Sequence, residues 1–169
     1  MANRLRFTIL GCGTSTGVPR IGGDWGACDP NNPKNLRTRC SLLAEQFGTG
    51  DNPTRILIDT SPDMRQQVLH AGVGSIDGVF YTHSHADHIH GIDDLRGFAM
   101  NMGRRVDVYA DKSTMARLKS GFGYCFKTPA GGDYPPILNS CEIVAGETVT
   151  VSGAGGALAA LPVLQNHGS

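Results

Sequence analysis

The sequence predicts a protein of the α/β (α+β) class, built on a mixed β-sheet with helices outside it. Three observations support this prediction: strand-forming segments come first, helices then alternate with strands, and strands return at the end. The chain has 169 residues and is 40% hydrophobic, which is enough to bury a core. We therefore expect residues 1–169 to form a single domain.

Each expected element has a local signal. Residues 5–10 alternate in hydrophobicity and are rich in strand formers. Pro62 stands in the first turn of the helix expected over residues 61–71, where a missing N–H is tolerated. The other expected strands cover residues 40–47, 55–59, 78–82, 106–110, 140–144, 148–151 and 157–164, and the other expected helices cover 87–100 and 112–120.

Residues 18–39 are expected to form a long irregular loop. This stretch combines prolines, glycine pairs, asparagines and aspartates with the tryptophan Trp25. Loops of this length in a compact domain usually have a function. Glycine accounts for 23 of the 169 residues, well above its average share, which also indicates a site built from loops.

Composition and charge argue against several classes of protein. Lys and Arg total 15, as do Asp and Glu, so the formal net charge is zero and a long nucleic acid is not the expected partner. No segment approaches the ~18 apolar residues of a membrane helix, so we expect no membrane association. The five cysteines are widely spaced without a CxxC pair, which suits a reducing compartment and predicts a cytoplasmic protein.

The chemistry of the chain is concentrated between Thr82 and His88, in the sequence THSHADH. In an extended segment alternate side chains share a side, so His83 and His85 could bind one ion. Asp87 and His88 follow where the chain turns into a helix, and could bind a second ion beside the first. Imidazole and carboxylate ligands suit Zn²⁺, Fe²⁺ or Mn²⁺. A histidine-rich surface turn without metal is the weaker interpretation, because the motif directly follows a buried strand.

This pattern, HxHxDH after a strand, resembles the hallmark of the metallo-β-lactamase superfamily. Within that superfamily the chain is similar to the phosphonate-pathway cyclic phosphodiesterases in three segments: Leu10–Ser15, Ile58–Asp63 and Thr82–Arg96. The resemblance implies an αββα sandwich of mixed β-sheets with outer helices. It also implies an incomplete fold, because members normally continue further and supply a bridging aspartate and a final histidine.

The resemblance implies a set of metal ligands and two divalent metal ions as cofactors, Zn or Mn and alternatively Fe. The first ion would be bound by three histidines, and the second by an aspartate and a histidine: His83, His85 and His167, and Asp87 and His88. Asp59 would accept hydrogen bonds that orient the metal-binding histidines, or would instead belong to the cap of the following helix.

Further residues have weaker expectations. His90 would point away from the metal ions and could contact substrate. Arg96 is expected in a salt bridge, with binding of a phosphate as the alternative. Ser15, within the glycine-rich segment 11–17, could bind substrate at the floor of the site. Some relatives hold an extra zinc with clustered cysteines in the early loop; because this loop has only Cys28, we expect that zinc to be absent.

The implied activity is metal-assisted hydrolysis of a small, cyclic phosphodiester, and the expected partner is a small phosphodiester or a nucleotide-like substrate. Two metal ions ~3.5–4 Å apart would lower the pKa of a bridging water, and Asp87 would bind metal and orient the hydroxide. The alternatives are a tRNA 3′-processing endonuclease, a thioester or lactone hydrolase, and a metal- or nucleotide-binding protein without turnover. A homodimer is a further expectation.

Overall fold

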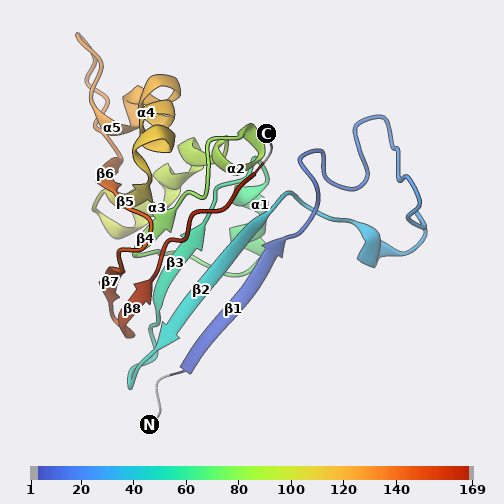
Figure 1. The fold of residues 1–169 in the computed structure, drawn as a ribbon, viewed down its shortest axis with the longest axis horizontal. Coiled ribbons are helices and arrows are strands. Elements are labelled where there is room, and N and C mark those ends of the chain that lie inside the picture. Colours follow the sequence, from blue (N-terminus) through green and yellow to red (C-terminus); the bar gives the residue numbers. More distant parts are fainter. Residues whose placement is uncertain (1–3, 168–169) are drawn as a thin grey trace.

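The computed structural model describes residues 4–167, which form a six-stranded sheet of order β1-β2-β3-β4-β5-β6 and a separate β7-β8 hairpin (Figure 1). The mixed α/β class is therefore confirmed. The strands are β1 (Arg4–Gly11), β2 (Ser41–Phe47), β3 (Thr54–Ile58), β4 (Gly78–Phe80), β5 (Val106–Ala110), β6 (Leu138–Glu142), β7 (Val149–Gly153) and β8 (Gly156–Ala160). The helices are η1 (Pro33–Asn35), α1 (Met64–His70), α2 (Ala86–Ile89), η2 (Ile92–Asp94), α3 (Leu95–Met102), α4 (Lys112–Gly121) and α5 (Gly123–Phe126).

The large sheet changes from antiparallel to parallel at β3. Strand β2 runs antiparallel to β1 and to β3, whereas β3, β4, β5 and β6 pair in parallel. Parallel neighbours need crossover connections, and the helices provide them. Because the carboxyl ends of β3 and β4 lie at the same edge of the sheet, the segments that follow them, from Asp59 and from Tyr81, come together there.

Alternation along the strands divides the core between the two faces of the large sheet. Leu57 and Val79 are fully buried in the cluster formed with the helices. Their neighbours Ile56 and Phe80 belong to a second cluster formed with the β7-β8 hairpin. The layers are thus helices, large sheet and small sheet (Figure 1). Among residues 4–167 no further helical layer covers the small sheet, and no helix is long and apolar enough to span a bilayer.

The helix expected over residues 87–100 is wrong as a single element, because the structure divides it into α2, η2 and α3. The break occurs at Gly91, whose N–H donates to the carbonyl of Thr60 at 2.9 Å. A Cβ at this position would overlap the carbonyl oxygen of Ser61. The close approach of two segments therefore determines where α2 ends, and no local signal for it exists apart from the glycine itself.

Two smaller differences concern the ends of elements. Helix α5 was not predicted, and the strand expected over residues 157–164 ends at Ala160. Ala160 pairs with Val149, the first residue of β7, so the ladder has no partner further on. From there the chain continues along the large sheet toward α2, where the described residues end (Figure 1).

The loop expected over residues 18–39 contains only η1 and isolated bridges, as predicted, and extends away from the sheet (Figure 1). Its base is held by reciprocal hydrogen bonds of 2.9 Å between the backbones of Val18 and Arg37. Most of its side chains are exposed, and Ile21 is fully so.

Candidate metal centre

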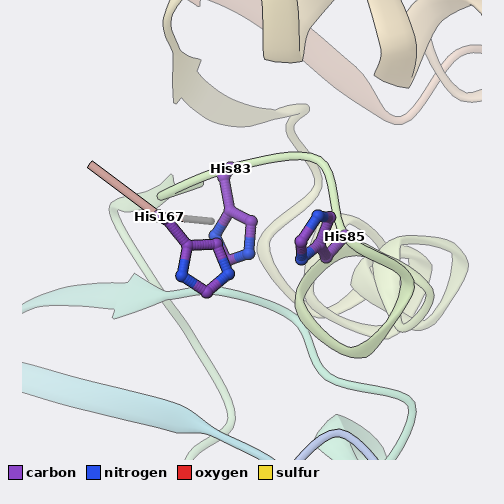
Figure 2. Close-up of side chains that lie close together, drawn as sticks. All are labelled: His83, His85 and His167. Carbon is purple, nitrogen blue, oxygen red and sulfur yellow. The ribbon is translucent and has the colours of Figure 1, made fainter. Parts of the chain in front are cut away.

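Three histidine side chains from two distant segments converge beyond the carboxyl end of β4 (Figure 2). His83 and His85 follow β4, and His167 comes from the segment after β8. One ring nitrogen from each lies within 4.8 Å of the others. The structure therefore brings together the three side chains that the sequence predicts for a first metal site, and their role as ligands stays a prediction.

The predicted second pair lies directly beside this cluster. His88 is in α2, and its ring centroid lies 4.2 Å from that of His83. Its Nε2 atom is 3.5 Å from Oδ2 of Asp87. His88 therefore lies against the three-histidine cluster with Asp87 beside it, and the assignment of these five residues to two metal ions stays a prediction.

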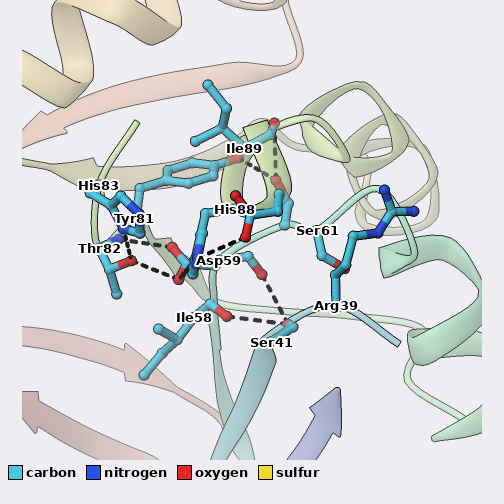
Figure 3. Close-up of polar contacts among 12 residues, drawn as sticks. Arg39, Ser41, Ile58, Asp59, Ser61, Tyr81, Thr82, His83, His88 and Ile89 are labelled. Carbon is cyan, nitrogen blue, oxygen red and sulfur yellow. Dashed lines mark hydrogen bonds and ion pairs between the residues drawn. The ribbon is translucent and has the colours of Figure 1, made fainter. Parts of the chain in front are cut away.

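Asp59 links His88 in α2 to Thr82, which directly precedes His83 (Figure 3). Its Oδ2 accepts hydrogen bonds from Nδ1 of His88 and from the hydroxyl of Thr82, both at 2.7 Å, and its Oδ1 accepts from the Thr82 N–H at 2.8 Å. Asp59 is 3% exposed and has a φ of 60°, in the left-handed region that aspartate tolerates better than most residues. The carboxylate is placed by the backbone turn that ends β3.

Thr82 fixes the proton on His83, a role that the sequence alone did not suggest. Because the Thr82 hydroxyl donates to Asp59, its oxygen is left to accept from Nδ1 of His83, 2.9 Å away. His83 is then protonated on Nδ1 and has a lone pair on Nε2. That Nε2 atom is buried and has no hydrogen-bond partner among the described residues. A buried, unpaired acceptor is costly unless something binds it.

The two central histidines have pKa values shifted in opposite directions. Burial, followed by the neighbouring His88, His85 and His167, lowers the pKa of His83. The hydrogen bond to Asp59 outweighs burial and raises the pKa of His88, with further contributions from the charges of Asp59 and Asp87. The lowered pKa favours the neutral form of the His83 ring, in which one ring nitrogen keeps its lone pair.

Helix α2 is attached to the segment that follows β3. The Thr60 N–H donates to the carbonyl of His88 at 2.8 Å, and the Thr60 hydroxyl lies 3.0 Å from the hydroxyl of Tyr81, which is fully buried. These contacts fix the start of α2, and with it the position of Asp87 and His88.

Arg39 and Asp63 form an ion pair close to the centre, and neither was predicted there. Nε and Nη2 of Arg39 donate to the two Asp63 oxygens at 2.9 and 2.6 Å, and the Arg39 N–H donates to Oδ2 at 2.9 Å. The hydrogen bond with Asp63, and more weakly the charge of Asp87, raise the pKa of Arg39. The partners are 24 residues apart, and Arg39 ends an irregular loop, so the sequence offered no signal for the pair.

The remaining predicted residues lie outside this network. The ring of His90 is edge-on to Phe122, with 5.8 Å between ring centroids. Arg96 pairs with Asp93 at 2.9 Å, which is the salt bridge the sequence favoured, and lies over the ring of Tyr134. Ser15 is exposed in a turn at the start of the long loop. Contacts of these residues with substrate stay predictions.

The chain belongs to the beta-lactamase superfamily, because the profile of the beta-lactamase superfamily domain matches residues 54–169. The matched region includes every predicted metal ligand. Both the fold and the family that the histidine motif suggested are therefore confirmed.

Three individual proteins are similar to the chain. A solved structure described as a new diphosphatase from the PhnP family matches with a TM-score of 0.71 and 37% identity, over 89% of this chain and 55% of that one. The chain is 42% identical to a protein of Porphyromonas gingivalis named octanoyltransferase, over 82% of this chain and 27% of that protein. It is 30% identical to coenzyme PQQ synthesis protein B of Rhodopseudomonas palustris, over 69% of this chain and 39% of that protein. The chain thus spans well under two thirds of each of these relatives.

Proposed function

We propose that this chain binds two divalent metal ions and acts in the hydrolysis of a small, cyclic phosphodiester. The observation on which this proposal depends is the buried, unpaired Nε2 of His83, which faces nitrogen atoms of His85 and His167. An acceptor cluster of this kind is stabilised when a cation binds at its centre.

The residues present fit such ions. His83, His85 and His167 would hold the first ion, and Asp87 and His88 the second, with Zn²⁺ or Mn²⁺ suited to the nitrogen and oxygen donors. When bound, the ions would lower the pKa of a coordinated water and neutralise charge on the phosphoryl oxygens.

The chain's own residues would position the reaction. The Asp59 carboxylate holds His88 directly and His83 through Thr82, so both rings present Nε2 to the centre. The free oxygen of Asp87 would accept a hydrogen bond from the attacking water and orient it toward phosphorus. Attack would form one P–O bond and break the ester P–O bond, and the leaving oxygen would take up a proton. No protein nucleophile is required.

Similarity supports the choice of a phosphorus ester. The diphosphatase of the PhnP family matches at 37% identity along most of this chain. The relative named octanoyltransferase matches over only 27% of its own length. Its name therefore gives weaker support to acyl chemistry in this chain. Hydrolysis of a thioester or lactone is therefore the alternative that a parallel assay must test.

The experiment uses the purified chain loaded with Zn²⁺ or Mn²⁺. We expect hydrolysis of a 2′,3′-cyclic nucleotide and of bis(p-nitrophenyl) phosphate, with little turnover of an acyl thioester or a lactone. Asp87→Ala should lose bound metal and at least ~100-fold in kcat/KM while the fold survives. The matched control is His70→Ala, an exposed histidine at the end of α1.

Other outcomes would assign the chain differently. Asp87→Ala activity close to that of the wild type would exclude the proposed site. A protein that holds two ions but hydrolyses none of the substrates would be a binding protein without turnover. Salt-dependent binding of tRNA would support the endonuclease alternative, because such binding depends on contacts with phosphates.

A further inference from the structure

Two cysteines, Cys12 and Cys40, lie on the two chain segments that meet where the long loop leaves the sheet. Gly11 in β1 pairs with Ser41 in β2, and just beyond the strands Gly13 forms a bridge with Arg39. Cys12 and Cys40 are the residues between these two contacts, one on each side. Their placement follows from the backbone pairing, and the hydrogen bond from the Gly13 N–H to the carbonyl of Thr38, at 2.7 Å, strengthens it.

Both thiols are free and accessible. Cys12 and Cys40 are exposed, whereas Cys125 is buried and the other two cysteines are partly buried. A disulfide between them requires their Cβ atoms to come within about 3.5–4.5 Å of each other.

The pair also lies near the candidate metal centre. Burial, the carboxylate of Asp59, the Cys12 thiol and the carboxylate of Asp87 together raise the pKa of Cys40. The residue after Cys40, Ser41, donates from its hydroxyl to the carbonyl of Asp59 at 3.0 Å. The thiol pair is thus one residue from a direct contact with the aspartate that orients the histidines.

We propose that Cys12 and Cys40 form a reversible disulfide that closes the base of the loop when the protein meets hydrogen peroxide. The Cys12 thiolate attacks a peroxide oxygen, which forms an S–O bond, breaks the O–O bond and, with a proton, releases water. The Cys40 sulfur then attacks the resulting sulfenic acid, which forms the S–S bond, breaks the S–O bond and releases a second water. The two sulfurs are oxidised, peroxide is reduced, and a dithiol reverses the reaction.

Cys12 is assigned the first step because burial raises the pKa of Cys40, which disfavours the thiolate form that attacks peroxide. The cross-link would join the two ends of the loop, residues 13–39, whose base is already closed by hydrogen bonds. A disulfide across a loop of this size should therefore raise Tm by roughly 5–10 °C.

The test treats the reduced, chelator-washed full chain with hydrogen peroxide and then alkylates the remaining thiols. Peptide mapping without reductant should find Cys12 linked to Cys40, and dithiothreitol should reverse both the link and the rise in Tm. Cys40→Ser should form no link but should give a sulfenic acid at Cys12 that dimedone traps. The control Cys28→Ser, in the same loop, should behave as the wild type.

Three results would overturn the proposal. The first is full alkylation of Cys12 and Cys40 after a peroxide treatment that oxidises other thiols. The second is a link from either cysteine to Cys28 in preference to the proposed pair. The third is a Cys12–Cys40 link that leaves Tm unchanged or lower, which would show that the pair is not placed for closure. None of these readouts depends on the proposed hydrolytic activity.

Discussion

Oδ2 of Asp59 lies 2.7 Å from Nδ1 of His88, and the same oxygen accepts the hydroxyl of Thr82, which in turn contacts His83. One buried carboxylate thus sets the orientation of a histidine in each half of the candidate centre. Because Nδ1 of each ring is engaged, by Thr82 in His83 and by Asp59 in His88, Nε2 is the nitrogen that each ring keeps for the proposed metal ions.

The first prediction concerns the charge and acceptor pattern of Asp59. In Asp59→Asn the amide oxygen can still accept the Thr82 N–H, but the amide nitrogen would face Nδ1 of His88. Two donors cannot pair, so His88 would shift its proton to Nε2 and lose its ligand atom. We expect affinity for Zn²⁺ to fall about 10- to 100-fold, measured by competition with a chromogenic chelator.

Asparagine tolerates the left-handed backbone of this position, so the fold of the variant should survive. Asp51→Asn, in the exposed turn between β2 and β3, is the matched control and should bind metal as the wild type does. Equal affinities for the two variants would show that Asp59 does not orient a metal ligand.

The second prediction concerns the break between α2 and η2. In Gly91→Ala the new methyl group would overlap the carbonyl oxygen of Ser61 and displace α2. We expect the free energy of unfolding to fall by about 2–3 kcal/mol, measured by urea denaturation. Gly97→Ala, inside α3 with open space around the added Cβ, should instead stabilise the chain by about 0.5–1 kcal/mol. Equal effects of the two changes would contradict the close approach at Gly91.

The third prediction concerns metal binding by the histidine cluster. A ligand that binds only the folded state raises stability by mass action, about 2.7 kcal/mol at a concentration of 100 times Kd. Zn²⁺ should therefore raise Tm of the wild type, and a chelator should reverse the rise. His83→Ala removes the buried nitrogen and should abolish the response, whereas His70→Ala should keep it. A Zn²⁺ response that persists in His83→Ala would place the bound ion elsewhere.

Much of the fold and most of the centre could be predicted because their signals are local. Alternation marked the strands, and the spacing of His83, His85, Asp87 and His88 was enough to group these ligands in two sets. His167 was recognised by family resemblance, since the 78 residues between it and His88 offer no pattern that joins them.

The missed features depend on contacts between distant segments. Thr82 acts through Asp59, which is 23 residues away, and Arg39 binds Asp63 across 24 residues. The break at Gly91 follows from the approach of Ser61, not from the helical propensity of residues 87–100. Such contacts leave no periodicity, so only the folded arrangement shows them.

The last prediction concerns Glu45, whose side chain is 1% exposed. Its carboxylate oxygens accept hydrogen bonds from Nε of Arg6 at 2.6 Å and from Nε of Arg55 at 3.1 Å. Burial alone would raise the pKa of this carboxyl, but the hydrogen bonds with Arg6 and Arg55 outweigh it, so its pKa lies below the ordinary value of 4.5. Its ionised form therefore stabilises the fold above pH 4.5, and this contribution is lost as the pH falls through the lower pKa of the folded state.

Glu45→Gln should consequently cost about 1–2 kcal/mol at neutral pH, because two charge-assisted hydrogen bonds are weakened while both arginines stay in contact with water. The difference in stability from the wild type should shrink as the pH falls below 4.5, measured by urea denaturation at a series of pH values. Glu147→Gln, at an exposed position before β7, should change stability little at any pH. A Glu45→Gln deficit that stays constant down to strongly acidic pH would show that packing of the side chain, and not its charge, holds β1, β2 and β3 together at this point.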